Sequence, residues 1–373
     1  MKNIIDYLKE RKNISFLEDP FNEVDGLVLA ELVYSNFNQI LDENSDMSIE
    51  ELSKEFWNLH TEKEIMSSPS TTKMAPFLMK EMEDSSRFKG MRVKKFVEDS
   101  SLEDIMQFAA LTFELPDGSV FISFRGTDGT VVGWAEDFKF SFSTTEGHKM
   151  AVDYINEYHK NQSKPIRVGG HSKGGNLAVF ASAFCDTSIR KKIVNVYSYD
   201  GPGFLMNIID SKEYKDILPR VLSVVPESSL VGTLLTNQYK TIITNADGFF
   251  VFQHDDMQWH IVDNHFEELE SRSEISLFFE EVLRNWQLRC DENEREEIFE
   301  AIFSLITDNE LLKEDDEKLT PAFFYNVIKK SSKLSGKDKS LLLDSISEVF
   351  SSISDVTKRK IKENLSTALK HDF

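Results

Sequence analysis

Residues 166–175 read Ile-Arg-Val-Gly-Gly-His-Ser-Lys-Gly-Gly, an apolar run followed at once by a glycine-rich turn. The run Ile166–Val168 is typical of a short strand, and the apolar spacing over 177–184 is helical. The turn between them fits G-x-S-x-G, in which a sharp bend lifts a serine hydroxyl above a sheet and glycines leave room for strand and helix. This pattern predicts Ser172 as a nucleophile. The alternative is a glycine-rich turn before a helix that Ser172 caps.

Outward from this turn, apolar and β-branched runs alternate with helical stretches. The runs expected to form strands are 106–115, 120–125, 166–168, 193–199, 221–225 and 241–244, with 249–252 as a last strand before His254. Strands separated by helices favour a parallel sheet with both faces covered. We therefore expect an α/β fold with a mostly parallel central sheet.

Both ends of the chain have a helical pattern. The first 90 residues read mostly as helices, and from about Glu270 onward the apolar periodicity is helical only. We therefore expect a domain over 1–269, with a helical N-terminal segment, and a helical C-terminal region over 270–373.

Composition limits the possible functions. The 373 residues are 40% hydrophobic and 29% charged, a globular composition, and the net charge of −21 argues against binding nucleic acid or an anionic membrane. The two cysteines cannot form a disulfide framework, which fits a reducing cytoplasm. Charged residues interrupt the N-terminus and no apolar stretch is long enough to span a bilayer, so we expect neither a signal peptide nor stable membrane insertion.

A nucleophilic serine needs a base, an acid that orients the base, and donors for the developing oxyanion. In the α/β-hydrolase arrangement these partners follow in the order Ser, acid, His. Of the eight histidines, His254 fits this order best because it follows an apolar run, with His260 as the alternative. His171 occupies the variable position of the motif, so we expect its ring to point away from the serine.

Two further segments carry a resemblance to a known family. Phe124-Arg125-Gly126-Thr127 lies at a strand end, Trp134-Ala135-Glu136-Asp137 follows it, and G-x-S-x-G comes some 45 residues later. With the Gly-Pro turn in 196–204, this set resembles the class 3 (fungal triacylglycerol) lipases, and Asn22–Leu27 is similar to a bacterial branch of that superfamily. The resemblance covers roughly 20–265 and implies an α/β-hydrolase fold.

The resemblance also implies site residues. Thr127 would supply one oxyanion donor, and the backbone N–H of Lys173 the second. The family places the acid after the strand that follows the Gly-Pro turn, where Glu227 is the only carboxylate; Asp200 and then Asp255 are the alternatives.

Other features have more than one interpretation. The segment 128–147 is either a mobile lid over an apolar acyl pocket or a fixed loop, and Asp137 in it either fixes the Thr127 hydroxyl or caps a short helix. The Lys173 side chain either reaches solvent or meets an anionic group. The acidic loop 254–265 holds three histidines, but their spacing does not put them on one helical face, so we expect neither a metal nor a cofactor.

These observations predict a serine hydrolase of the lipase or esterase type, which cleaves a small-molecule or lipid ester through an acyl-enzyme on Ser172, His254 and Glu227. The alternative is a non-catalytic binding or regulatory protein that retains the fold, with the helical C-terminal region as its partner surface. An acyltransferase or amidase would use the same residues. The oligomeric state is not readable from the sequence.

Overall fold

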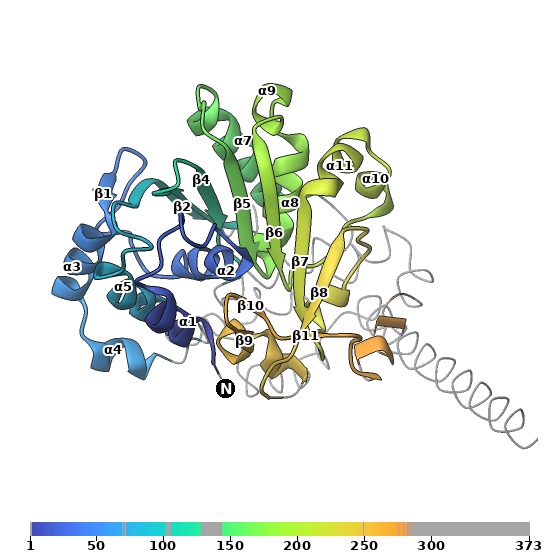
Figure 1. The fold of residues 1–373 in the computed structure, drawn as a ribbon. Coiled ribbons are helices and arrows are strands. Elements are labelled where there is room, and N and C mark those ends of the chain that lie inside the picture. Colours follow the sequence, from blue (N-terminus) through green and yellow to red (C-terminus); the bar gives the residue numbers. More distant parts are fainter. Residues whose placement is uncertain are drawn as a thin grey trace, which may run out of the picture.

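A computed structural model describes residues 2–68, 70, 72–101, 106–127, 144–248, 250–274, 276–278, 280–281 and 284. A nine-stranded sheet runs through these residues in the order β1-β2-β3-β4-β5-β6-β7-β8-β11 (Figure 1). Its strands are β1 (Asp46–Ser48), β2 (Arg92–Ser101), β3 (Met106–Glu114), β4 (Val120–Phe124), β5 (Ile166–His171), β6 (Ile193–Tyr199), β7 (Val221–Pro226), β8 (Lys240–Thr244) and β11 (Glu268–Leu269). A separate pair joins β9 (Ile261–Val262) to β10 (His265–Phe266).

The sheet is mixed, so the expectation of a mostly parallel sheet is wrong. Strands β4 to β8 are parallel, whereas β1 to β4 form an antiparallel meander and β11 pairs antiparallel with β8. The antiparallel pairing of β3 with β4 follows from the short Pro116-Asp117-Gly118 turn, because a connection of this length can join only antiparallel neighbours. The strands expected at 106–115, 120–125, 193–199, 221–225 and 241–244 are confirmed within a residue or two.

Helices precede the sheet and connect its parallel strands. They are α1 (Ile4–Arg11), α2 (Glu23–Leu32), α3 (Ile49–Leu59), α4 (Glu62–Ser67), α5 (Ala75–Glu83), α7 (Glu146–His159), α8 (Lys173–Phe184), α9 (Thr187–Arg190), α10 (Met206–Ile209) and α11 (Lys212–Ile217). Short 3₁₀ helices are η1 (Leu218–Arg220), η2 (Val231–Thr233), η3 (Phe250–His254) and η4 (Asp256–Gln258). The helical reading of the first 90 residues is confirmed.

Two apolar cores lie on opposite faces of the sheet, because side chains alternate along each strand. In β6, Tyr197 and Tyr199 join the core under α1, α2, α3 and α5, whereas Val196 joins the core under α7 and α8. Helix α2 contacts β4, β5 and β6 from the first side, and α8 contacts the same strands from the second (Figure 1). The parallel strands are therefore covered on both faces.

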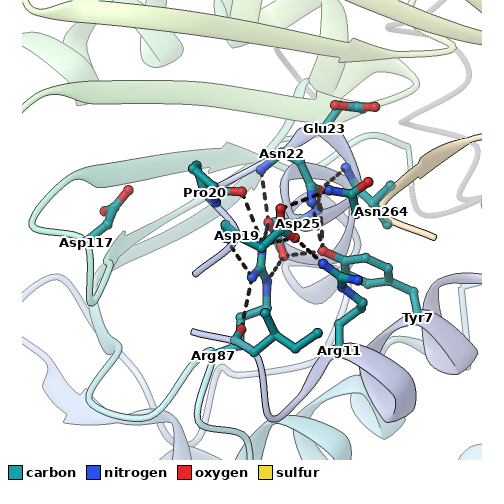
Figure 2. Close-up of polar contacts among 12 residues, drawn as sticks. Tyr7, Arg11, Asp19, Pro20, Asn22, Glu23, Asp25, Arg87, Asp117 and Asn264 are labelled. Carbon is teal, nitrogen blue, oxygen red and sulfur yellow. Dashed lines mark hydrogen bonds and ion pairs between the residues drawn. The ribbon is translucent and has the colours of Figure 1, made fainter. Parts of the chain in front are cut away.

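A buried ion pair ties the N-terminal helices together (Figure 2). The Arg87 guanidinium donates to both carboxylate oxygens of Asp25 in α2, at 2.7 and 2.6 Å, and both side chains are fully buried. The same guanidinium donates to the carbonyls of Ile14 and Asp19, and the Tyr7 hydroxyl of α1 donates to Asp25. This network joins α2 to α1 and to the loop segments that hold Asp19 and Arg87.

The expected helical region over 270–373 lies largely outside the described residues, as does the segment 128–143. The described residues between 274 and 284 are helical, and Ser273 bonds through its backbone N–H to the carbonyl of Glu227. The domain boundary at 269 stays a prediction. Among the helices that the structure describes, none combines the length and apolarity needed to cross a bilayer.

Candidate active site

Ser172 occupies a sharp turn between β5 and α8, as the motif predicts. Its backbone has φ 57° and ψ −132°, a region that side chains rarely adopt and that is tolerated mainly at functional sites. A Cβ on Gly170 would collide with the backbone of Gly174, and one on Gly174 with the carbonyl of Phe124, so both positions need glycine. The Ser172 side chain makes no capping bond to α8, which contradicts the alternative that it serves as a helix cap.

His254 lies beside this serine, but not at the end of a strand. The expected last strand at 249–252 is wrong, because Phe250–His254 form the 3₁₀ helix η3. The adjacent Gln253 side chain bonds to the backbone of Ser228 and Ala246, and its carbonyl accepts from the buried indole of Trp259. These bonds hold the loop so that His254 Nε2 lies 2.9 Å from Ser172 Oγ.

Asp200, the alternative acid, is the carboxylate that contacts the histidine. Its Oδ2 lies 2.6 Å from His254 Nδ1, and its side chain is fully buried. The Ser229 hydroxyl and the Gly232 N–H donate to the other oxygen, Oδ1. An ionised aspartate that accepts all three bonds fixes the Nδ1–H tautomer of His254 and leaves Nε2 to accept from serine.

The prediction of Glu227 as this acid is wrong. Asp200 follows β6 directly and adopts φ 46°, which turns its carboxylate toward His254. The loop after β7 contributes Ser229 and Gly232 as donors to that carboxylate, whereas Glu227 is held there through its backbone by Thr244 and Ser273. Asp255, the third choice, caps η4 through the N–H of Met257.

The sequence did not predict that His171 contacts His254. Its ring lies 4.7 Å from the His254 ring, and its Nε2 lies 2.9 Å from the His254 carbonyl. Because a carbonyl can only accept, Nε2 carries the proton. Burial lowers the pKa of His171 to about 3, with the neighbouring His254 adding to the effect, so the ring is neutral at ordinary pH. No signal in a single sequence distinguishes this position from a variable one.

Of the two expected oxyanion donors, Lys173 directly follows the serine, and Thr127 follows Gly126, which lies close to it. Thr127 follows β4, the strand that pairs with β5, and a Cβ on the preceding Gly126 would lie 3.1 Å from the Ser172 Cβ. Lys173 begins α8, so its N–H is the first after the serine. Its side chain is buried and donates to the carbonyl of Gln107 at 2.7 Å, which contradicts the solvent-reaching interpretation.

The loop histidines do not converge on one point. His260 lies between the carboxylates of Asp247 and Glu267, at 3.0 Å from each, and His265 is exposed. The lid hypothesis for 128–147, including Trp134 and Asp137, falls almost wholly outside the described residues.

Solved structures similar to this chain include several lipases. The lipase of Rhizopus microsporus var. chinensis has 16% identity and a TM-score of 0.30 over 39% of this chain and 56% of its own. M37 lipase has 12% identity and a TM-score of 0.34 over 58% of this chain and 70% of its own. Rhizomucor miehei lipase, in complex with its propeptide, has 16% identity and a TM-score of 0.29 over 38% and 51%. The chain thus spans about half the length of two of these lipases.

A family model gives a broader match. No curated protein matched the chain. Residues 82–304, which include Ser172, Asp200 and His254, match the model of the Mbeg1-like family, a family related to the class 3 lipases. The family-level resemblance and a lipase-like fold are therefore confirmed, whereas the bacterial branch stays a prediction. Since the match spans more than half of the 373 residues, the chain belongs to the Mbeg1-like family.

Proposed function

We propose that this protein is a serine hydrolase that cleaves carboxylic esters through an acyl-enzyme. The observation that carries the proposal is the unbroken hydrogen-bonded chain from Ser172 through His254 to Asp200, at 2.9 and 2.6 Å. These distances are within hydrogen-bond reach for proton transfer. Three residue types in this order and contact are the arrangement that activates a serine hydroxyl.

The reaction follows from the contacts. Ser172 Oγ attacks the ester carbonyl while His254 Nε2 takes its proton, and Asp200 stabilises the imidazolium that forms. The imidazolium then gives its proton to the departing alcohol, which leaves an acyl group on Ser172. Water attacks this acyl group with His254 again as the base, which releases the acid and restores the serine.

The tetrahedral intermediate needs donors at its oxyanion. We assign this role to Thr127, three residues after the end of β4, and to the backbone N–H of Lys173, which follows Ser172 at the start of α8. An amide at the start of a helix is a suitable donor because the helix dipole favours negative charge there. Substrates would be small-molecule or lipid esters.

The non-catalytic alternative rested mainly on the lack of a convincing acid in the sequence. Asp200 contacts His254 as a triad acid must, which weakens that alternative. No observation in the described part of the chain favours a binding role over hydrolysis.

The proposal is tested with a fluorophosphonate probe and with p-nitrophenyl acetate and butyrate. We expect labelling of the wild type at Ser172, and ester hydrolysis that Ser172→Ala and His254→Gln both abolish. The matched control is His265→Gln, an exposed histidine on the neighbouring β10. A folded wild type that neither labels nor hydrolyses these esters, or a Ser172→Ala variant with wild-type rates, would contradict the proposal.

A further inference from the structure

Three metal-binding side chains meet behind the catalytic pair, on elements far apart in the sequence. Glu31 comes from α2, His171 from the end of β5, and Asp256 from η4. All three are buried, and each places one nitrogen or oxygen atom within 4.8 Å of those of the other two.

The two carboxyl groups lie against each other, away from water. Apart from this mutual contact, Glu31 Oε2 and Asp256 Oδ2 have no hydrogen-bond partner among the described residues. No lysine or arginine pairs with either carboxyl among the described residues, in contrast to the Asp25–Arg87 pair elsewhere on α2. The cluster is therefore short of positive charge.

His171 completes the set with a defined lone pair. Its Nε2–H donates to the His254 carbonyl, so a neutral ring leaves Nδ1 as an acceptor. The Tyr34 hydroxyl lies 3.4 Å from Nδ1, a long contact, and also 3.3 Å from the His171 carbonyl. The bond from Nε2–H to the His254 carbonyl is the kind of second-shell bond that orients a ligating imidazole in metal sites.

We propose that Glu31, His171 and Asp256 bind one divalent transition-metal ion, Mn²⁺ or Zn²⁺. Two carboxylates cancel the charge of such an ion, and a mixed oxygen and nitrogen set suits Mn²⁺ or Zn²⁺ better than the all-oxygen sites of Ca²⁺. Two ligands at about 2.1 Å from one ion and at the tetrahedral angle lie about 3.4 Å apart. The side chains therefore need to close by up to about 1.4 Å from the 4.8 Å limit.

The ion would stabilise the site without entering the reaction. Asp256 lies two residues after His254, and His171 directly precedes Ser172. An ion held by these two side chains and by Glu31 joins α2, the serine turn and the histidine loop. Its binding is independent of hydrolysis, so the two proposals can fail separately.

The test titrates MnCl₂ and ZnCl₂ into the EDTA-treated, dialysed full-length protein by calorimetry at pH 8, with CaCl₂ and MgCl₂ for comparison. We expect one site for Mn²⁺ or Zn²⁺ and a rise in the melting temperature of about 2 °C or more at saturation. Glu31→Gln and Asp256→Asn should weaken binding by at least about 100-fold, because each removes a charged ligand.

Asp255→Asn is the matched control, since it removes one negative charge from the same loop and retains a side chain that can cap η4. It should bind like the wild type, and so should Ser172→Ala. Circular dichroism checks that each variant is folded. The proposal is overturned if the wild type binds neither transition metal, if it binds only Ca²⁺ or Mg²⁺, or if Glu31→Gln and Asp256→Asn bind like Asp255→Asn. The two carboxyls would then retain protons in place of an ion.

Discussion

Asp25 and Asp200 are both fully buried aspartates, but their partners differ in chemistry and access. Asp25 receives two bonds from the equally buried Arg87, whose other N–H groups bond to backbone carbonyls (Figure 2). Asp200 receives one bond from His254, whose side chain is 29% exposed and touches Ser172. A guanidinium does not give up its proton at any ordinary pH, whereas an imidazole gains and loses one near neutrality.

A structural buried charge differs from a chemical one in whether its partner can release a proton. Desolvation disfavours both carboxylates, and both are compensated by hydrogen bonds. The N–H groups of Arg87 bond to Asp25 and to backbone carbonyls, so the Arg87–Asp25 pair can only hold α2 in place. In His254, Nδ1 contacts Asp200 and Nε2 faces the Ser172 hydroxyl, so the His254–Asp200 pair can move a proton.

The largest expected effect is on kcat, when the Asp200 carboxylate is replaced. Asp200→Asn should lower kcat by about 10⁴, because an amide neither stabilises the imidazolium nor selects the right tautomer. Steady-state hydrolysis of a p-nitrophenyl ester measures it, with circular dichroism as the check on folding. Glu227→Gln is the matched control and should leave kcat unchanged; a comparable loss there would restore Glu227 as the acid.

The next largest effect is on the free energy of unfolding, when Asp25 loses its partner Arg87. Arg87→Met should lower the free energy of unfolding by about 3–5 kcal/mol, because it leaves Asp25 buried and unpaired. Urea unfolding measures it. The control is Arg92→Met, which removes a partly exposed pair with Asp46 and should cost about 1 kcal/mol or less. Equal losses in the two variants would mean that burial of the Asp25 pair has no special importance.

A smaller effect is the pH dependence of the free energy of unfolding, which buried histidines produce and buried arginines do not. Burial lowers the pKa of His148 and His159 to about 4, so below pH 6.5 the unfolded chain takes up protons that the folded chain does not. The free energy of unfolding should therefore fall by about 1.6 kcal/mol for each of these histidines between pH 6.5 and pH 5.

Urea unfolding at the two pH values tests this dependence. His159→Gln should show a shallower loss of stability than the wild type, whereas the exposed His265→Gln should match it. An unchanged slope in His159→Gln would show that His159 is already protonated in the fold.

The smallest effect concerns the support of Asp200. Ser229→Ala removes one hydrogen bond to the buried carboxylate and should lower kcat about 10-fold, equivalent to about 1.5 kcal/mol. Ser228→Ala is the control, because that hydroxyl bonds to Ser273 instead. Equal kcat values for the two variants would show that the Ser229 hydroxyl does not support Asp200 in catalysis.

The turn that holds Ser172 was predictable from the sequence, and so was the approach of His254 to it, for different reasons. Ser172 lies in a local pattern, since the glycines of its turn are required by contacts within the turn and with the adjoining strand. His254 followed from its position after the serine and after an apolar run, although that run forms η3 and not a strand. Order along the chain was sufficient even where the secondary structure was wrong.

The carboxylate that contacts His254 was not predictable in the same way. Glu227 and Asp200 both follow strands after Ser172, and no local pattern distinguishes them. The direction of the Asp200 carboxylate depends on one positive φ and on donors from the loop after β7. The contact of His171 with His254 depends likewise on a loop that returns from a distant part of the chain.

Short-range information thus accounts for the strands, the helices and the serine turn, since periodicity and glycine sterics act between near neighbours. Which carboxylate meets the imidazole, and the gathering of Glu31, His171 and Asp256 in one buried place, depend on how α2, β5, β6 and the η3–η4 loop pack against each other. Packing of this kind sums many weak contacts between remote residues, and no short window of sequence contains it.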